Sequence, residues 1–179
     1  VGLMVLAEPL CASLFQYGKF TAQDTRMVAA AVSAMSIGIP AFMLSKVLLP
    51  AFYSRHDTKT PMKVAVWTVL VNIALIAALV TVLRWLESPF AHVGIALATA
   101  LAGIFNAVAL QRMLHREGAY SPEAGWGRWL LKIAAACTVM VLVVLLIRWQ
   151  VGDWRILPGM QRIGWLLLAV IAGASSYLA

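Results

Sequence analysis

The sequence predicts an all-α protein, a polytopic transmembrane helical bundle, from three observations. Hydrophobic residues make up 63% of the chain and charged residues only 12%, and the mean hydropathy is +0.88. In soluble domains about a quarter of the residues are charged. The apolar runs are long enough for helices that cross a bilayer core, which takes roughly 20 residues. These runs are continuous and lack the period of two of a transmembrane β-barrel, so helices surrounded mainly by lipid are expected.

The apolar residues form six segments, and each predicts a helix. The chain opens at Val1 inside an apolar run, so the first segment is expected to be the tail of a helix and the chain a piece of a longer protein. Short connections predict that successive helices run antiparallel, with loops alternating between the two membrane sides. The segments are 1–15, 27–52, 62–83, 93–114, 130–147 and 163–178.

Polar and helix-breaking residues mark the predicted helix ends. Gly18 is expected to end the first helix, and Thr21 or Asp24 to cap the second. Thr60 is predicted as the N-cap of the third segment, with Pro61 in its first turn, where the missing amide hydrogen has no helical partner anyway.

The fourth segment carries small residues at four-residue spacing, which lets neighbouring helix backbones approach closely. We therefore expect this helix to lie wedged among others. The fifth segment has large branched side chains along its second half, "TVMVLVVLLI", which is expected to face lipid. The small residues form two rows, Gly94, Ala98 and Ala102 in one and Thr99, Gly103 and Ala107 in the other.

Charge and cysteine content restrict the classes of partner. The net charge is +7, from 14 basic and 7 acidic residues, which suits loops that touch anionic lipid. The bases are spread among short loops, so nucleic acid is not expected as a partner. The positive-inside rule favours the side that holds the loops "SRHDTKT" and "HREGAY" as the cytoplasmic side, by seven basic residues against six. Cys11 and Cys137 are expected to pack as small apolar residues rather than to form a disulfide or zinc site.

Lys46 is the most informative single residue, because it interrupts an apolar run. One interpretation is a lysine whose long stem snorkels to the interface. The other is an ammonium that faces a water-filled cavity and meets an anion there, as intramembrane charges usually face a bundle interior or a transport path. Gly38 and Pro40 in the same segment predict a bent or loosened helix, and a flexible helix with an inward cation suits a transporter.

The stretch "SRHDTKTP" concentrates polar residues between two apolar segments. Serine, histidine and aspartate are all present, but a nucleophilic triad is a spatial arrangement that neighbouring residues on a tight loop rarely form. The alternatives are a loop held together by Asp57 bonding to Arg55, Lys59 or backbone amides, and a surface that attracts phosphate-bearing lipid heads. A proton relay through His56 also stays open.

Other polar residues inside the apolar segments are expected to hold helices together or to pair. Thr68, Asn72 and Asn106 are predicted to form interhelical hydrogen bonds. Glu8, beside Pro9, is expected to pair with a cation or bind one. The sequence contains no paired-aspartate diphosphate motif, no "HExxH" and no phosphate-cradling glycine loop, so an enzyme is disfavoured.

Three stretches together resemble one protein family: "LFQYGKFTAQDT", "GIPAFMLSKVLLPAFYSRHDTKTPMKVA" and "ALQRMLHREGAYSPEAGW". They are similar to the carboxy-terminal part of the MurJ family, also called MviN. This family comprises lipid II flippases of bacterial peptidoglycan synthesis within the multidrug/oligosaccharidyl-lipid/polysaccharide (MOP) exporter superfamily. The resemblance covers essentially the whole chain and is strongest over residues 15–63.

The resemblance implies a fourteen-helix MOP-type transporter of the bacterial inner membrane with two pseudo-symmetric lobes. Residues 1–114 would supply the end of the ninth helix and helices ten to twelve. Residues 115–179 would supply a cytoplasmic loop and the last two helices, whose hydrophobic groove holds the undecaprenyl tail. Lys46 matches a lysine of the tenth helix. A cytoplasmic loop motif of the family is matched by Arg55, Asp57, Thr58, Lys59, Thr60 and Pro61.

The resemblance also implies the function and partners. The protein would be no enzyme but would translocate lipid II, an undecaprenyl-pyrophosphate-linked disaccharide-pentapeptide, by alternating access. Its partners would be lipid II, membrane lipids and the missing amino-terminal part of the same chain. No cofactor is expected, although some relatives use a sodium ion, whose ligands the sequence does not place. The alternatives are another MOP-type exporter, of a drug or polyprenyl-linked oligosaccharide, and an intramembrane enzyme acting on lipid-linked phosphate.

Overall fold

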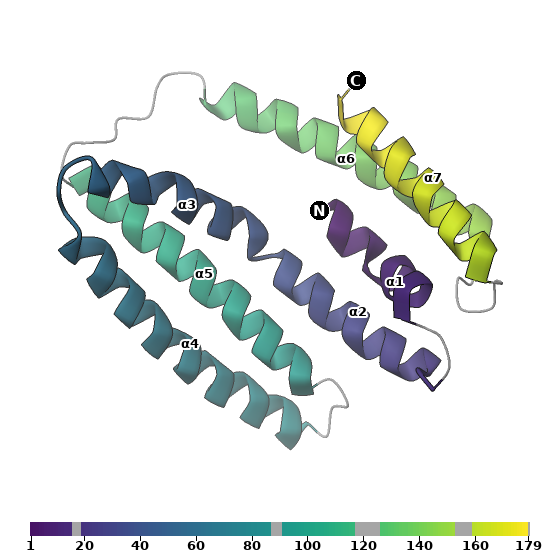
Figure 1. The fold of residues 1–179 in the computed structure, drawn as a ribbon, viewed down its shortest axis with the longest axis horizontal. Coiled ribbons are helices and arrows are strands. Elements are labelled where there is room, and N and C mark those ends of the chain that lie inside the picture. Colours follow the sequence, from purple (N-terminus) through teal and green to yellow (C-terminus); the bar gives the residue numbers. More distant parts are fainter. Residues whose placement is uncertain (16–18, 87–90, 117–125, 153–158, 179) are drawn as a thin grey trace. The chain divides into compact units, whose positions relative to one another are not determined.

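The computed structural model describes residues 1–15, 19–86, 91–116, 126–152 and 159–178. Within these ranges the regular structure is helical and no β-strand is present, which confirms the all-α prediction (Figure 1). Four stretches are long and apolar enough to cross a membrane, Ala22–Tyr53, Lys59–Trp85, His92–Arg116 and Gly127–Val151. The helices are α1 (Gly2–Phe15), α2 (Ala22–Ser36), α3 (Ile39–Tyr53), α4 (Lys59–Trp85), α5 (Ala91–Arg116), α6 (Trp126–Val151) and α7 (Gly159–Leu178).

The chain folds as two compact units. The first unit comprises Val1–Ser33 and Glu123–Ala179, and the second comprises Ala34–Pro122. Helices α1, α6 and α7 belong to the first unit, with most of α2, and helices α3, α4 and α5 to the second. The division of the chain at residue 114, predicted from the sequence, stays a prediction.

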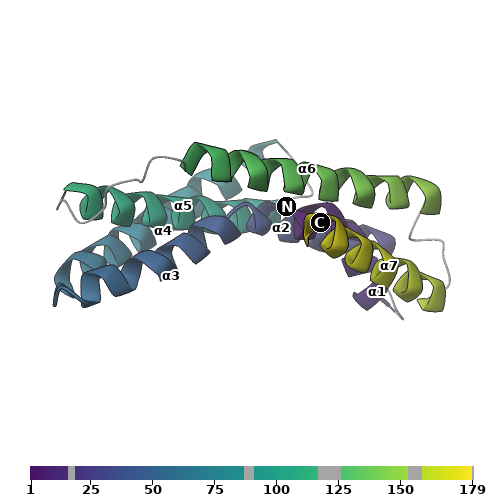
Figure 2. The ribbon, with the colours of Figure 1, turned by 90° about the horizontal axis from the view of Figure 1, so that it is seen from above.

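In the second unit, α5 packs against both α3 and α4, as the small-residue rows predict (Figures 1 and 2). Ala98, Ala102 and Ala107 are each 3% exposed or less. At Gly94, an added Cβ would lie only 3.0 Å from a Leu83 methyl group of α4. The prediction that this helix is wedged among others is therefore confirmed.

The contact between α3 and α5 depends on two glycines. A Cβ added at Gly38 would lie 2.8 Å from the Cα atom of Ala100, closer than real Cβ atoms come to backbone. A Cβ added at Gly103 would lie 2.2 Å from the Phe42 ring. The absence of side chains at these positions lets the two backbones approach and seats the Phe42 ring against Gly103.

A buried hydrophobic cluster of the second unit lies next to the connection between α3 and α4. Phe52 is fully buried at its centre, and Val64 of α4 and Leu110 of α5 are 2% exposed or less. One core thus joins all three helices. Leu48 and Leu114 complete the cluster.

In the first unit, α1 packs against α6 and α7, which also pack against each other. Leu6 of α1, Val144 of α6 and Ala169 of α7 form one buried cluster. Cys11 is buried in a second cluster with Ala7 of α1 and Ala29 of α2, as expected for a small packing residue.

The second half of α6 has two different faces. Val139, Leu142 and Leu146 are about half exposed, whereas Val144 is 1% exposed. The prediction that this half faces lipid is wrong for the Val144 side, because α1 and α7 cover it. For the exposed side it stays a prediction.

The start of α2 is capped by the two residues that the sequence predicted as cap candidates, Thr21 and Asp24. The Asp24 amide donates to the Thr21 hydroxyl at 3.2 Å, and the Thr21 amide donates to the Asp24 carboxylate at 2.9 Å. These reciprocal bonds form a capping box. Both residues therefore cap the helix, where the sequence offered them as alternatives.

Candidate functional site

The longest apolar span is broken near its middle. Helices α2 and α3 together form the 32-residue stretch Ala22–Tyr53, about 48 Å at 1.5 Å per residue, against a bilayer core of about 30 Å. Regular helix stops at Ser36 and resumes at Ile39. Discontinuous helices of this kind form the substrate and ion sites of many transporters.

The local sequence explains the break. The amides of Ile37 and Gly38 donate to carbonyls only three residues earlier, at 3.3 and 3.0 Å, so the chain tightens there. Pro40 then stands in the first turn of α3, where it needs no helical donor. The bend predicted from Gly38 and Pro40 is thus confirmed as an interruption of the helix.

Lys46 projects from α3 between this break and the loop that follows α3. Its side chain is exposed, whereas the preceding Ser45 is 6% exposed and faces the interior of the second unit. The face of α3 that bears Lys46 therefore differs from the face that packs on α5. Whether its ammonium meets an anion stays a prediction.

Beside Lys46, three polar side chains join the three helices of the second unit. Asn106 of α5 donates its amide to the Ser45 hydroxyl at 3.0 Å. Its carbonyl oxygen lies 3.2 Å from the Thr68 hydroxyl of α4, which also lies 2.8 Å from the Val64 carbonyl. The interhelical roles predicted for Thr68 and Asn106 are confirmed, and Ser45 is a partner that the sequence did not reveal.

Asn72 departs from the same prediction. It lies one turn after Thr68 on α4, yet its Oδ1 atom is buried and accepts no hydrogen bond from the described residues. The interhelical hydrogen bond predicted for Asn72 is therefore wrong for the described residues.

The polar loop begins with a helix terminus built around His56. The Asp57 amide donates to the Phe52 carbonyl at 3.1 Å, and the His56 amide to the Tyr53 carbonyl at 3.0 Å. This pair of bonds is a Schellman motif, which places its central residue in the left-handed region. His56 has a φ of 57°, a conformation that usually favours glycine.

The Asp57 carboxylate caps the next helix. It accepts the amides of Lys59 at 3.1 Å and Thr60 at 3.0 Å. The structure therefore corrects the sequence prediction for Thr60: α4 begins at Lys59 with Thr58 at the N-cap position. A carboxylate three residues ahead of Thr60 supplies the acceptor that the Thr60 hydroxyl was expected to supply. Pro61 lies in the first turn, as predicted.

Hydrogen bonds and charge hold the Asp57 carboxylate in its ionised form. Its pKa is lowered first by hydrogen bonding to the Thr60 side chain, then by the Thr60 amide, with smaller contributions from the Lys59 amide and the Lys63 charge. The loop predicted to be held together by Asp57 is confirmed through backbone amides. Arg55, Thr58 and Lys59 are exposed on its surface, and Pro61 is buried.

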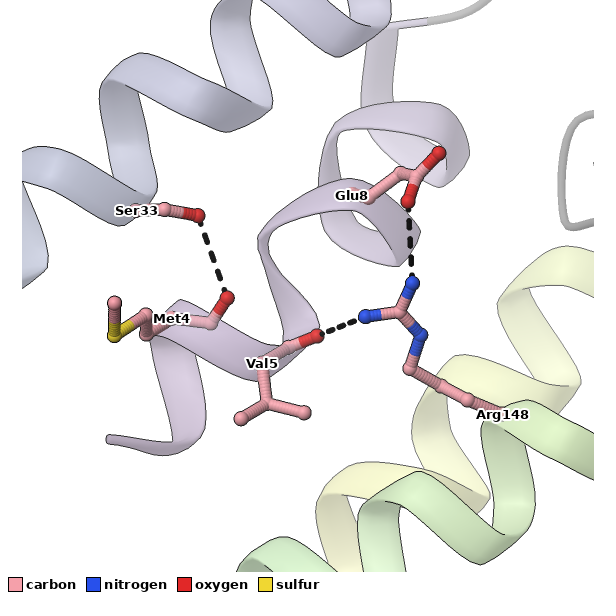
Figure 3. Close-up of polar contacts among 5 residues, drawn as sticks. All are labelled: Met4, Val5, Glu8, Ser33 and Arg148. Carbon is pink, nitrogen blue, oxygen red and sulfur yellow. Dashed lines mark hydrogen bonds and ion pairs between the residues drawn. The ribbon is translucent and has the colours of Figure 1, made fainter.

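The first unit holds an ion pair between α1 and α6. An Arg148 nitrogen lies 3.1 Å from a Glu8 carboxylate oxygen, and a second nitrogen donates to the Val5 carbonyl at 2.9 Å (Figure 3). The expectation that Glu8 pairs with a cation is confirmed. The sequence did not identify Arg148 as the partner, since the two residues lie 140 positions apart.

No three His, Cys, Asp or Glu side chains come together as a metal site in the described part of the chain. The polar groups brought together inside the units are instead amides, hydroxyls and ion-paired side chains. Such groups suit helix packing and hydrogen bonding rather than a tightly bound transition metal.

Comparison with known proteins decides the family. The model of the family "Lipid II flippase MurJ" matches residues 1–156. The chain belongs to this family. Membership and the four apolar spans make it a multi-pass protein of the bacterial inner membrane.

Individual relatives agree with this assignment. A probable lipid II flippase MurJ of Vibrio cholerae is 35% identical over 182 residues, which cover 100% of this chain and 33% of the relative. Its counterpart in Rickettsia prowazekii is 34% identical over 82% of this chain and 28% of the relative. The lipid II flippase MurJ of Burkholderia cenocepacia is 33% identical over 78% of this chain and 26% of the relative. The chain thus spans about a third or less of these relatives.

Proposed function

We propose that the chain forms the carboxy-terminal part of a flippase that moves lipid II across the inner membrane by alternating access. The family match over residues 1–156 carries this proposal. The broken span Ala22–Tyr53 supports it, because discontinuous helices let a membrane protein place polar groups at bilayer depth. The remaining helices would come from the amino-terminal part of the same protein.

The physical task of such a protein is to replace water around the pyrophosphate. Moving an anion through hydrocarbon is prohibitive unless fixed cations and water stand in for its hydration shell. We assign one of these cations to Lys46, which is exposed on α3, while the adjacent Ser45 is bonded to Asn106 of α5. The bond fixes the rotation of α3 and therefore the direction of the Lys46 side chain.

The undecaprenyl tail needs an apolar path instead. In this proposal residues 115–179 supply it, along the outer faces of α6 and α7. Leu142 and Leu146 of α6 and Leu167 and Ile171 of α7 are each more than half exposed. All four side chains are apolar, as a path for a polyprenyl chain requires.

The loop between α3 and α4 is proposed to contact lipid headgroups or the amino-terminal lobe on the cytoplasmic side. Arg55 and Lys59 are exposed there on a rigid frame set by two helix caps. Coupling to the membrane potential or to an ion gradient, sodium included, belongs to the same proposal, and no sodium ligand is assigned.

Translocation by the full-length protein tests the proposal. Vesicles that contain the protein and lipid II labelled on the inner leaflet are expected to expose the label outside, and Lys46→Ala to abolish this exposure. Lys46→Arg should retain much of it, because a cation remains. Lys132→Ala is the matched control, since the Lys132 ammonium lies 5.6 Å from the Trp129 ring centroid, as an interfacial lysine would.

Three outcomes would contradict the proposal or its assignment of Lys46. Full activity of both Lys46 variants would show that Lys46 is not a cavity cation but a lysine whose long stem reaches to the membrane interface. Depletion of the protein in cells should cause lipid II to accumulate in the inner leaflet. If a chemical precursor of lipid II accumulated instead, an enzyme acting on lipid-linked phosphate would be the better function. Transport of a different cargo in the vesicles would favour another exporter.

A further inference from the structure

Helix α1 contains a proline that leaves one of its carbonyls without a helical donor. Pro9 lies inside α1 and has no amide hydrogen. In a regular helix the amide of residue 9 would donate to the carbonyl of Val5. The Val5 carbonyl therefore needs a donor from elsewhere, because a buried or lipid-facing carbonyl that lacks one is costly.

Arg148 of α6 supplies that donor. Its guanidinium bridges two groups of α1, with one nitrogen 2.9 Å from the Val5 carbonyl and another 3.1 Å from the Glu8 carboxylate (Figure 3). One rigid group thus satisfies both the carbonyl that Pro9 leaves open and the carboxylate of the residue before Pro9. Arginine suits this position because its donors are fixed in one plane.

A second arginine makes a similar contact from α7. Arg162 donates to the Ala12 carbonyl at 3.3 Å and is only 8% exposed. Ala12 lies in the last turn of α1, where carbonyls lack donors within their own helix. Arg162 lies near the start of α7, the end at which the helix dipole disfavours a cation. The local sequence of α7 therefore does not explain its burial, whereas the contact with α1 does.

We propose that Arg148 and Arg162 are positioning residues that clamp the α6–α7 pair onto α1 through the carbonyls of Val5 and Ala12. Val5 and Ala12 are seven residues apart, about 10 Å along the helix. Attachment at two points, one from each helix of the pair, opposes both sliding and rotation. The pair then moves with α1 as one body. The role of this movement in transport rests on the proposed function.

A double-mutant cycle in the full-length protein tests the clamp without any transport measurement. Arg148→Met is expected to lower the midpoint of thermal unfolding, since it leaves the Val5 carbonyl and the Glu8 carboxylate without this partner. Pro9→Ala restores an amide donor to Val5, so it should raise the midpoint more in the R148M background than in the wild type. Glu8→Gln should likewise lower the midpoint of thermal unfolding less in the R148M background than in the wild type.

The control variant is Arg128→Met, which removes an exposed arginine near the other end of α6. Pro9→Ala should shift the midpoint of thermal unfolding by the same amount in the Arg128→Met background and in the wild type. Equal effects of Pro9→Ala in the R148M background and in the wild type would overturn the clamp, even if R148M itself unfolds at a lower temperature. The coupling thus separates a specific carbonyl contact from a general loss of stability.

A cross-link between α1 and α7 tests whether α1, α6 and α7 move together as one body. Leu6→Cys and Ala169→Cys place thiols in the cluster shared by α1 and α7, in a protein whose Cys11 and Cys137 are replaced by alanine. Joining the two thiols with a short bifunctional reagent should leave lipid II translocation unchanged. Loss of translocation on cross-linking would overturn the proposal. If the protein moved no lipid II even before cross-linking, the proposed function would fail, and the thermal coupling would still decide the clamp.

Discussion

The two units of this protein hold their helices together by different means. In the second unit, α3, α4 and α5 meet through glycine and alanine, and neutral hydrogen bonds link Ser45, Asn106 and Thr68. In the first unit, α6 and α7 are joined to α1 through arginines that donate to backbone carbonyls. Close packing gives the second unit little freedom to adjust. The arginine contacts of the first unit depend on a few donors that single substitutions remove.

The packing of the second unit should be most sensitive at Gly38. Gly38→Ala places a Cβ 2.8 Å from the Ala100 backbone, so α3 and α5 must separate. We expect a loss of about 1–3 kcal/mol in unfolding free energy, typical of overpacking. Unfolding of the full-length protein in detergent measures it.

The matched control for this change lies in the first unit. Gly164 in α7 has no atom within 4 Å of its added Cβ, so Gly164→Ala should be neutral or stabilising by up to about 1 kcal/mol. Equal losses from both alanine variants would show that close packing does not distinguish the two units.

The Asp57 cap should give a smaller, pH-dependent effect. Asp57→Ala removes the acceptor for two amides of α4, so the unfolding temperature should fall at pH 7. The folded pKa of Asp57 lies below its unfolded value near 4. Its stabilisation is therefore complete above pH 4 and is lost as the pH falls through the folded pKa.

Unfolding temperatures of the wild type and the variant, measured between pH 7 and pH 3, check this sign. The difference in unfolding temperature between the wild type and the Asp57→Ala variant should become smaller below about pH 4. A gap that stays constant down to pH 3 would mean that the carboxylate charge does not contribute to the cap.

The hydrogen bonds of Asn106 should contribute less than close packing does. Asn106→Leu removes the bonds to both Ser45 and Thr68, and interhelical bonds in membrane proteins average about 0.6 kcal/mol. We therefore expect a loss of about 1 kcal/mol, again from unfolding in detergent. A loss larger than that of Gly38→Ala would reverse the ranking of forces in this unit.

The smallest effect is expected at His56. Its φ of 57° suits glycine, so His56→Gly should relieve strain and change the stability by about 0.5 kcal/mol or less once the flexibility of unfolded glycine is included. Thermal unfolding measures the change. A large destabilisation would show that the His56 side chain makes contacts that its exposure does not suggest.

Periodicity and local chemistry predicted much of the fold. The apolar runs located the helices, Gly38 and Pro40 predicted the break, and the small-residue rows predicted the wedged position of α5. These features are encoded within a few turns of one helix. The Thr60 cap was predicted wrongly because threonine and aspartate are both good caps, and only the loop geometry selects Asp57.

The sites required information that local sequence does not contain. Pro9 shows that the Val5 carbonyl lacks a helical donor, but not which of 14 basic residues supplies one. That choice depends on how helices 140 or more positions apart pack together. The same holds for Ser45, a small residue in an apolar run whose bond to Asn106 appears only when α3 lies beside α5.

The direct test of the central claim is the environment of Lys46 in the full-length protein. Lys46→Cys and Val47→Cys, in a background without Cys11 and Cys137, are treated with a charged thiol reagent that does not enter lipid. Both positions are exposed on α3, and Val47 is 72% exposed. If Lys46 faces a wetted cavity, the cysteine at that position reacts and added lipid II slows the reaction, while the one at 47 resists. Equal resistance at both positions would place the Lys46 ammonium among acyl chains and contradict its assignment as a cavity cation.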